Sequence, residues 1–229
     1  PKFTPTALVV GAADHGPPLT PSEAALLLID HQSALLLSVQ TQSAEEMRNN
    51  ALALAKVGRL YDLPTVFTTS GAAGPNGPLL PGMRALHPDA PVIDRTLFFD
   101  AMTDPAFAGA VERTGRRQLI MAGITTDYCL ALPAITARRL GYDVWAVIDA
   151  SGAWSRVIED VAVTRMAQHG VHVVTWAVVL AELQSNLAVR DADAALAKQR
   201  DVVSLLSERV AAIDYMITTF TTHGTAVLP

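Results

Sequence analysis

A single cysteine, Cys129, follows a segment that predicts a sharp turn from a strand into a helix. The apolar run of residues 118–122 ends at Gly123 and continues as Ile-Thr-Thr-Asp-Tyr before the cysteine. Such a turn places the sulfur at the start of the helix, where unpaired backbone N–H groups favour a thiolate. We therefore interpret Cys129 as a candidate nucleophile; the alternative is a small buried hydrophobe, the usual role of a lone cysteine.

Hydrolysis by a thiol also needs a group that moves protons and donors that bind the oxyanion. Asp30, which ends the apolar run of residues 24–29, is the candidate proton carrier; its alternative role is a helix cap. The backbone N–H groups of Thr125 and Cys129 are the candidate oxyanion donors. Arg95, which follows a short run at 91–93, is a cation that could pair with Asp30 and lower the pKa of the thiol.

The segments around these residues alternate between strand and helix patterns. Strands are expected at 24–29, 64–69, 91–93, 117–122, 142–148 and 171–175, and helices at 44–60, 104–113, 129–140 and 155–169, with a loop at 71–81. Ser43 and Ser155 are suited to N-caps, and Gly141 and Gly170 to helix stops. This alternation predicts an α/β fold: a doubly wound parallel sheet with helices on both faces, in three layers.

Ligands of doubly wound sheets bind beyond the carboxyl ends of the strands. Residues that each follow a predicted strand are therefore expected to meet at one edge: Asp30, Arg95, Cys129, Asp149 and the 71–81 loop. Four aromatic residues lie on segments that reach the same edge and are expected to bind substrate, the alternative for each being a place in the core: Phe98, Phe99, Tyr128 and Trp154.

The composition limits the function classes. The 229 residues carry a net charge of −5 with interspersed signs, which argues against a nucleic-acid partner. One cysteine cannot form an internal disulfide, and no apolar run approaches the roughly 18 residues of a membrane span, so we expect a cytoplasmic location. A mean hydropathy of +0.29 predicts apolar surface buried in a homo-oligomer; the alternative is an alanine-rich monomer with a large core.

Three regions are expected along the chain: an N-terminal arm at 1–20, a hydrolase domain at 21–190 and a helical extension at 191–229. The extension is helical in pattern from 193 to 220, as one long C-terminal helix. Its apolar residues recur at spacings of three and four, at Val203, Leu206, Val210, Ile213 and Ile217. This stripe could serve oligomerisation or pack back on its own domain.

Three motifs together resemble the isochorismatase-like cysteine hydrolases. They are Asp30 after Leu-Leu-Leu-Ile, Gly-Ile-Thr-Thr-Asp-Tyr-Cys at 123–129, and Gly-Tyr-Asp-Val-Trp-Ala-Val-Ile-Asp-Ala-Ser-Gly at 141–152. The resemblance covers roughly residues 22–190. Within that superfamily, Asp-His-Gln at 30–32 and Gly-Pro-Asn-Gly-Pro-Leu at 74–79 are similar to a branch of small bacterial amidohydrolases whose substrates are mostly unassigned.

The resemblance implies a triad of Asp, Lys and Cys, and a non-proline cis peptide bond four residues before the cysteine. Here that bond would be Ile124–Thr125, which would direct the Thr125 N–H to the oxyanion. The chain departs from the family at the lysine, because its three lysines lie elsewhere and Arg95 takes that position. Since arginine stays protonated, proton transfer would fall to Asp30, with Arg95 as an electrostatic and orienting group.

The favoured hypothesis is a hydrolase that cleaves the C–N bond of a small, non-peptide amide through a thioester at Cys129. Two alternatives stay open: a binding or assembly protein that lost activity when Arg95 replaced the lysine, and a redox thiol, which lacks a resolving cysteine. No Gly-x-Gly-x-x-Gly, P-loop lysine or Asp-x-His pair occurs, so we expect no cofactor and no metal.

Overall fold

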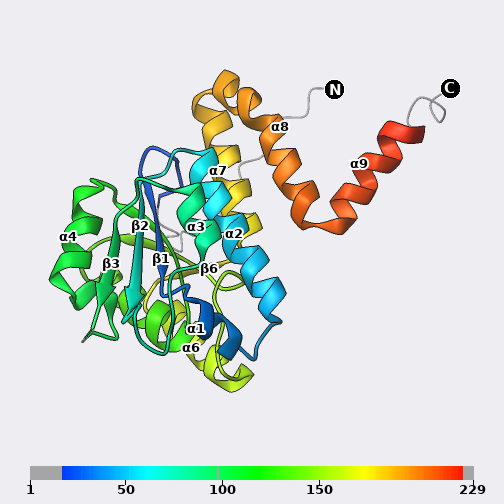
Figure 1. Ribbon diagram of the computed structural model, residues 1–229. Helices are drawn as coiled ribbons and strands as arrows, with labels where there is room; N and C mark the ends of the chain where they lie inside the picture. Colours follow the sequence, from blue (N-terminus) through cyan, green and yellow to red (C-terminus); the bar gives the residue numbers. More distant parts are fainter. Residues whose placement is uncertain (1–16, 97, 224–229) are drawn as a thin grey trace.

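The structure, a computed structural model, describes residues 17–96 and 98–223 and contains one six-stranded parallel sheet (Figure 1). The strand order is β3-β2-β1-β4-β5-β6. The strands are β1 (Ala24–Ile29), β2 (Thr65–Ser70), β3 (Val92–Arg95), β4 (Gln118–Gly123), β5 (Asp143–Val147) and β6 (His172–Val174). The predicted doubly wound α/β fold is confirmed.

Helices cover both faces of this sheet (Figure 1). One face is packed by α1 (Ser33–Ser38), α2 (Ala44–Leu60), α3 (Pro81–Leu86), α7 (Trp176–Arg190) and α8 (Ala192–Arg209). The other is packed by the 3₁₀ turn η1 (Ala101–Thr103), α4 (Pro105–Arg113), the π turn η2 (Thr126–Leu130), α5 (Ala131–Arg139) and α6 (Arg156–Gln168). The helix α9 (Ala211–His223) follows α8 and leads away from the sheet (Figure 1).

The continuous apolar sequence of β1 explains its central position. Its six residues are fully buried, and they alternate between the two faces: Leu26 and Leu28 join one core, whereas Leu27 and Ile29 join the other. A strand with apolar side chains on both faces is stable only where helices cover it on both sides. The sequence of β1 therefore requires the three-layer arrangement.

The order of the strands creates a crevice between β1 and β4. The chain runs from β1 outward to β2 and β3, then returns to place β4 on the other side of β1. The connections that follow β1 and β4 thus leave in opposite directions, which opens the sheet edge between them. Asp30 follows β1 and Cys129 lies in the turn after β4, so both flank this crevice.

Most helix boundaries follow the capping signals of the sequence. The side chains of Ser43, Asp104 and Ser155 accept backbone N–H groups at the starts of α2, α4 and α6. Three helices were not predicted, namely α1, α3 and α7. The first two are six residues long, too short for a periodic pattern. Helix α7 is longer, and Thr175 at its N-cap is the signal that could have identified it.

The expected single C-terminal helix is interrupted. Val210 has an extended backbone, with φ −122° and ψ 96°, so α8 ends before it and α9 begins after it. The stripe residues Leu206 and Val210 are partly buried against the domain core, beside the buried Val202 and Leu205 of α8, which agrees with the alternative of packing back. By contrast, Met216 and Phe220 of α9 are 67% and 71% exposed. Packing on the domain therefore accounts for the first half of the tail only.

The end of the predicted N-terminal arm packs against the domain. Residues 1–16 lie outside the described part of the chain, but Leu19 and Thr20 are buried. Both polar atoms of the Gln118 side chain bind this segment: Oε1 accepts the Thr20 N–H at 2.9 Å, and Nε2 donates to the Pro18 carbonyl. Across residues 17–96 and 98–223, no helix combines the length and apolar character needed to cross a bilayer.

Candidate active site

Asp30 occupies a turn immediately beyond β1. Its φ of +56° lies in the left-handed region, which Asp tolerates better than most residues. The Asp30 N–H still donates to the Thr68 carbonyl of β2 at 2.9 Å, so the turn starts while the strand is still paired. The carboxylate is completely buried at the carboxyl edge of the sheet.

Arg95 reaches this carboxylate from β3, across the intervening strand β2. Its Nη2 donates to both carboxylate oxygens of Asp30, at 2.6 Å to Oδ1, and both side chains are 1% exposed. The Nε of Arg95 donates to Thr68 Oγ1 of β2 at 2.8 Å, and Nη1 donates to the Phe98 carbonyl. Each of the three guanidinium nitrogens thus has a partner, which fixes the orientation of the group.

The turn that carries Cys129 is held tightly to the end of β4. The Gly123 N–H donates to Ser151 Oγ, and a Cβ at Gly123 would lie 2.8 Å from the Cys129 carbonyl oxygen, so only glycine fits. The Ile124–Thr125 bond is cis, as the family resemblance implies. The segment that follows is the π turn η2 rather than the start of a regular α-helix.

The surroundings of the Cys129 thiol raise its pKa, in contrast to the expectation that the turn and Arg95 lower this pKa. Burial raises the pKa of Cys129 well above its ordinary value. The charge of Asp30 and the hydrogen bond from the thiol to that carboxylate raise this pKa further. The Arg95 charge and the Thr125 backbone N–H lower the pKa, but these effects are smaller. The prediction considered the two smaller effects and neglected desolvation, which requires the tertiary structure.

The carboxyl group of Asp30 has a raised proton affinity. Burial raises its pKa above the ordinary value, and the lowering effects of Arg95, Cys129 and Ser70 only partly offset that shift. A carboxylate that binds a proton more tightly is a stronger base, and it already accepts the thiol hydrogen bond. The pair can therefore pass one proton from sulfur to oxygen when a substrate arrives.

Only one of the two expected oxyanion donors is available. The Cys129 N–H donates to the Thr125 carbonyl at 2.8 Å within the π turn, so it is already engaged. The Thr125 N–H hydrogen-bonds to the Cys129 sulfur instead. An N–H within reach of the sulfur is also near an oxygen on a carbon bonded to that sulfur. The geometry thus favours Thr125 and argues against the Cys129 N–H in this role.

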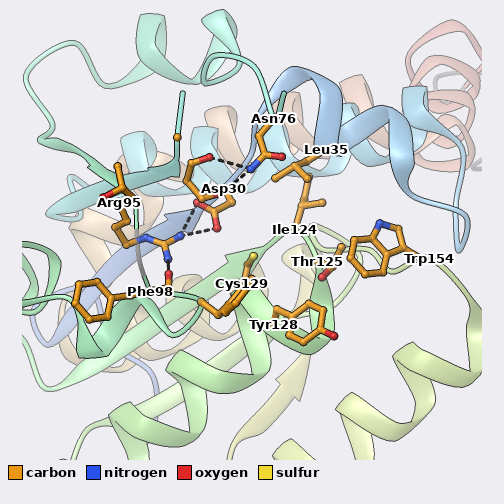
Figure 2. Close-up of a pocket in the computed structure, with 14 residues that line it drawn as sticks. Asp30, Leu35, Asn76, Arg95, Phe98, Ile124, Thr125, Tyr128, Cys129 and Trp154 are labelled. Carbon is orange, nitrogen blue, oxygen red and sulfur yellow. Dashed lines mark hydrogen bonds and ion pairs between the residues drawn. The ribbon is translucent and has the colours of Figure 1, made fainter. Parts of the chain in front are cut away.

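A cavity of about 350 Å³ opens over these groups (Figure 2). It is lined by Asp30, Arg95, Thr125, Cys129, Phe98, Phe99, Tyr128 and Trp154, so the structure brings all the sequence-predicted site residues together. The rings of Phe99 and Tyr128 lie 5.7 Å apart, and those of Tyr128 and Trp154 lie 6.0 Å apart. All four aromatic residues are partly or largely exposed, which places them at the mouth rather than in the core.

Further lining residues come from segments whose role the sequence showed only in part. The predicted wall at 71–81 contributes Gly71 and Asn76, whereas Leu35, Ser70, Thr96 and Ile124 were not singled out. Leu35 lies on α1, which was not predicted. Ser70 ends β2 at the same edge as the other candidates, and that position is the signal that could have identified it. Its hydrogen bond to Asp30 lowers the pKa of that carboxyl.

The remaining polar residues at this edge have structural contacts. Asp149 accepts the Trp176 N–H at 2.9 Å, at the start of α7, and burial raises its pKa to about 6. His31 is buried and its Nε2 hydrogen-bonds to the Ala150 carbonyl at 2.9 Å; burial lowers its pKa to about 4. Within the described ranges, no cluster of three or more His, Cys, Asp or Glu is arranged to hold a metal ion.

Comparison with known proteins identifies relatives over most of the chain. The isochorismatase domain model matches residues 24–178. YcaC of Escherichia coli, named as a probable hydrolase, is 42% identical over 168 residues, which cover 73% of this chain and 81% of that protein.

Two solved structures have the same overall fold. YcaC from Pseudomonas aeruginosa, with hexane-2,5-diol and covalent acrylamide, is 38% identical with a TM-score of 0.82, covering 89% of this chain and 97% of its own. The Escherichia coli YcaC structure is described as an octameric hydrolase of unknown specificity. It is 37% identical with a TM-score of 0.82, covering 90% of this chain and 97% of its own.

The raised pKa of Cys129 can be measured directly, because the chain has no other thiol. We expect the ultraviolet absorbance of the thiolate to be absent at neutral pH and to develop only above the pH range in which an ordinary thiol ionises. Asp30→Asn removes a negative charge and so lowers the pKa of the thiol. Cys129→Ser supplies the blank, and a thiolate signal at pH 7 in the wild-type protein would contradict the assignment.

Proposed function

Since this chain belongs to the isochorismatase family of hydrolases, we propose that it cleaves the C–N bond of a small amide through a thioester at Cys129. The observation that carries this proposal is the buried contact between the Cys129 thiol and the Asp30 carboxylate at the floor of the cavity. It joins a nucleophile to a base of raised proton affinity beside an oxyanion donor.

The first half-reaction begins with both groups in their resting protonation states. As the sulfur attacks the amide carbonyl carbon, the thiol proton moves to Asp30 and the Thr125 N–H binds the developing oxyanion. Asp30 then returns this proton to the nitrogen as the C–N bond breaks. The products are a free amine or ammonia and an acyl group bonded to Cys129.

Water completes the reaction by the reverse order of proton transfers. Asp30, again a carboxylate, accepts a proton from the water that attacks the thioester carbon. The sulfur leaves and takes up that proton, which restores the thiol and releases a carboxylic acid. No oxidant, reductant or cofactor is needed in either half.

Arg95 keeps Asp30 ionised between these steps without exchanging protons itself. Burial raises the pKa of this carboxyl, and the guanidinium offsets part of that effect. Arginine does not lose its proton, so of the two groups in this ion pair only the Asp30 carboxylate can carry the proton that leaves the thiol. The family lysine is therefore replaced by a cation with three fixed contacts, which favours a working site over a scaffold that has lost its activity.

The dimensions of the site favour a small substrate with an apolar acyl group. A cavity of about 350 Å³ lies at the lower end of ligand pockets, and its mouth is aromatic. The acrylamide held covalently by the Pseudomonas aeruginosa relative supports a reactive group on this scaffold that accepts a small amide.

The chain assembles into a homo-oligomer through α9. Four apolar residues share one face of this helix, Ile213, Met216, Ile217 and Phe220, with Met216 and Phe220 largely exposed. An exposed apolar helix face of this kind is usually covered in the assembled protein. The octameric state of Escherichia coli YcaC, whose structure matches 90% of this chain, supports an assembly here.

Mass spectrometry of the intact protein tests the acyl-enzyme. With a panel of aliphatic and aromatic amides, we expect a mass increase equal to the acyl group in the wild-type protein, located at Cys129. Cys129→Ala should show neither this adduct nor turnover. Hydrolysis that persists in Cys129→Ala would overturn the mechanism, and oxygen adducts after peroxide treatment in place of acyl adducts would favour the redox alternative.

Substitutions of Arg95 test its electrostatic role. Hydrolysis needs ionised Asp30, so kcat/KM falls as the pH drops through the pKa of that carboxyl. Arg95→Met removes a charge that lowers the pKa of Asp30, so the acid limb should move to higher pH and activity at pH 7 should fall by about 100-fold. Arg95→Lys retains the charge and should keep or raise activity. Identical profiles for Arg95→Met and the wild type would exclude the role.

Light scattering after size-exclusion chromatography tests the role of α9. Met216→Asp with Phe220→Asp places two charges on the apolar face and should reduce the assembly to smaller species. Thr218→Asp adds a charge on the opposite face of the same helix and should leave the molar mass unchanged. A monomeric wild-type protein, or an assembly that survives the double substitution, would rule out this interface.

A further inference from the structure

Asn76 lies in the wall of the cavity, and both its backbone and its side chain are held by hydrogen bonds. Its backbone carbonyl accepts the Ala34 N–H at 3.1 Å, and its Nδ2 donates to the Ser70 carbonyl at 2.8 Å and to Ser70 Oγ at 3.0 Å. A backbone carbonyl can only accept a hydrogen bond, so the amide atom that faces it must be the NH₂ group. The orientation of this amide is therefore set by its partners.

This orientation leaves the Asn76 Oδ1 available to a ligand. Both hydrogens of Nδ2 are committed to Ser70, and Oδ1 lies on the opposite side of the amide (Figure 2). No donor from the described residues contacts Oδ1, although Asn76 lines the cavity. An acceptor that is held in place and has no protein partner is suited to a substrate donor.

Ser70 connects this amide to the proton carrier. Ser70 Oγ accepts a hydrogen bond from Asn76, and its own hydrogen is shared between Gln32 Oε1, at 3.3 Å, and Asp30, with which it is hydrogen-bonded. Two consecutive hydrogen bonds place Asn76 Nδ2 at most about 6 Å from a carboxylate oxygen of Asp30. The Asn76 amide and the Asp30 carboxylate therefore lie near each other in the wall of the same cavity.

We propose that Asn76 Oδ1 accepts a hydrogen bond from the scissile nitrogen and so makes this site selective for amides that carry an N–H on that nitrogen, primary amides among them, an inference that rests on the hydrolase function proposed above. The nitrogen of a primary amide carries two hydrogens and receives a third from Asp30 as the C–N bond breaks. With one N–H held by Asn76, the nitrogen lone pair that develops in the tetrahedral intermediate is turned toward Asp30. Ammonia is then the leaving group.

Esters and N,N-dialkylated amides lack this hydrogen. Their leaving atom would leave Oδ1 without a donor, and an ester oxygen would also direct a lone pair at it. A site built to hydrogen-bond a substrate group discriminates strongly against analogues that lack the group. We expect the preference for a primary amide to be at least about tenfold, the effect of one such hydrogen bond.

Hydrolysis of matched substrates is the first test. Benzamide, N,N-dimethylbenzamide and methyl benzoate share one acyl group that suits an aromatic mouth. In Asn76→Ala, kcat/KM for benzamide should fall at least about tenfold, whereas that for methyl benzoate should change by less than about threefold. Pro75→Ala is the matched control, because Pro75 adjoins Asn76 on the same loop, is exposed and does not line the cavity. It should affect the amide and the ester equally.

A binding test separates this inference from the proposed reaction. Protection of Cys129 against methyl methanethiosulfonate, followed by intact mass, reports occupancy of the cavity whether or not the bound amide is hydrolysed. Benzamide should protect the wild-type thiol at a concentration at least about tenfold lower than N,N-dimethylbenzamide does, and Asn76→Ala should abolish this difference. Equal protection by the two amides in the wild type, or a difference that persists in Asn76→Ala, would overturn the inference. Selective protection with no acyl-enzyme would instead retain the inference and contradict the proposed hydrolysis.

Discussion

Two opposite charges meet out of water where β1 and β3 end, with the side chains of Arg95 and Asp30 each 1% exposed. Burying either ion alone costs several kcal/mol, and removing one member of such a pair typically costs about 3–5 kcal/mol. The pair is tolerated because its other polar atoms are also satisfied, by Thr68 and the Phe98 carbonyl around the guanidinium and by Ser70 and Cys129 around the carboxylate. These contacts join the ends of three neighbouring strands and the turn after a fourth, so the position of the nucleophile depends on them.

The same dry environment determines the chemistry of the sulfur. Desolvation is the largest contribution to the raised pKa of Cys129, and it also raises the pKa of Asp30, so a single proton is shared between two groups that both bind it tightly. In the proposed reaction, the nucleophile forms only as a substrate carbonyl binds in the cavity. Arg95 would there supply charge and orientation, and it would leave proton transfer to the carboxylate. Asn76, linked to Asp30 through Ser70, extends this network toward the leaving group.

Where the sequence carries local signals, it predicted the elements well. Helix α2 begins after Ser43 and α4 begins at Pro105, as expected, because capping is decided by atoms within three residues of the helix start. The buried run of β1 likewise reports its own environment, since an all-apolar strand must be covered on both faces. The failures are local departures from a regular helix that the apolar periodicity does not show. The interruption at Val210 divides an apolar stripe that is continuous in sequence. The Cys129 N–H is hydrogen-bonded within a π turn, which the spacing of apolar residues does not predict.

The sequence by itself determined which strand ends carry reactive side chains and that these ends share one edge, because parallel strands connected by helices all point the same way. It also determined that the cation at position 95 is an arginine and not a lysine. Only the tertiary structure decided that Arg95 crosses β2 to reach Asp30, that the pKa of the thiol is raised, and that the Asn76 amide presents its oxygen to the cavity. The pairing of charges and the pKa of the thiol depend on neighbours distant in the chain and on the exclusion of water, and the Asn76 amide is oriented by the folded loop that brings it to Ser70. None of these can be inferred from the local sequence.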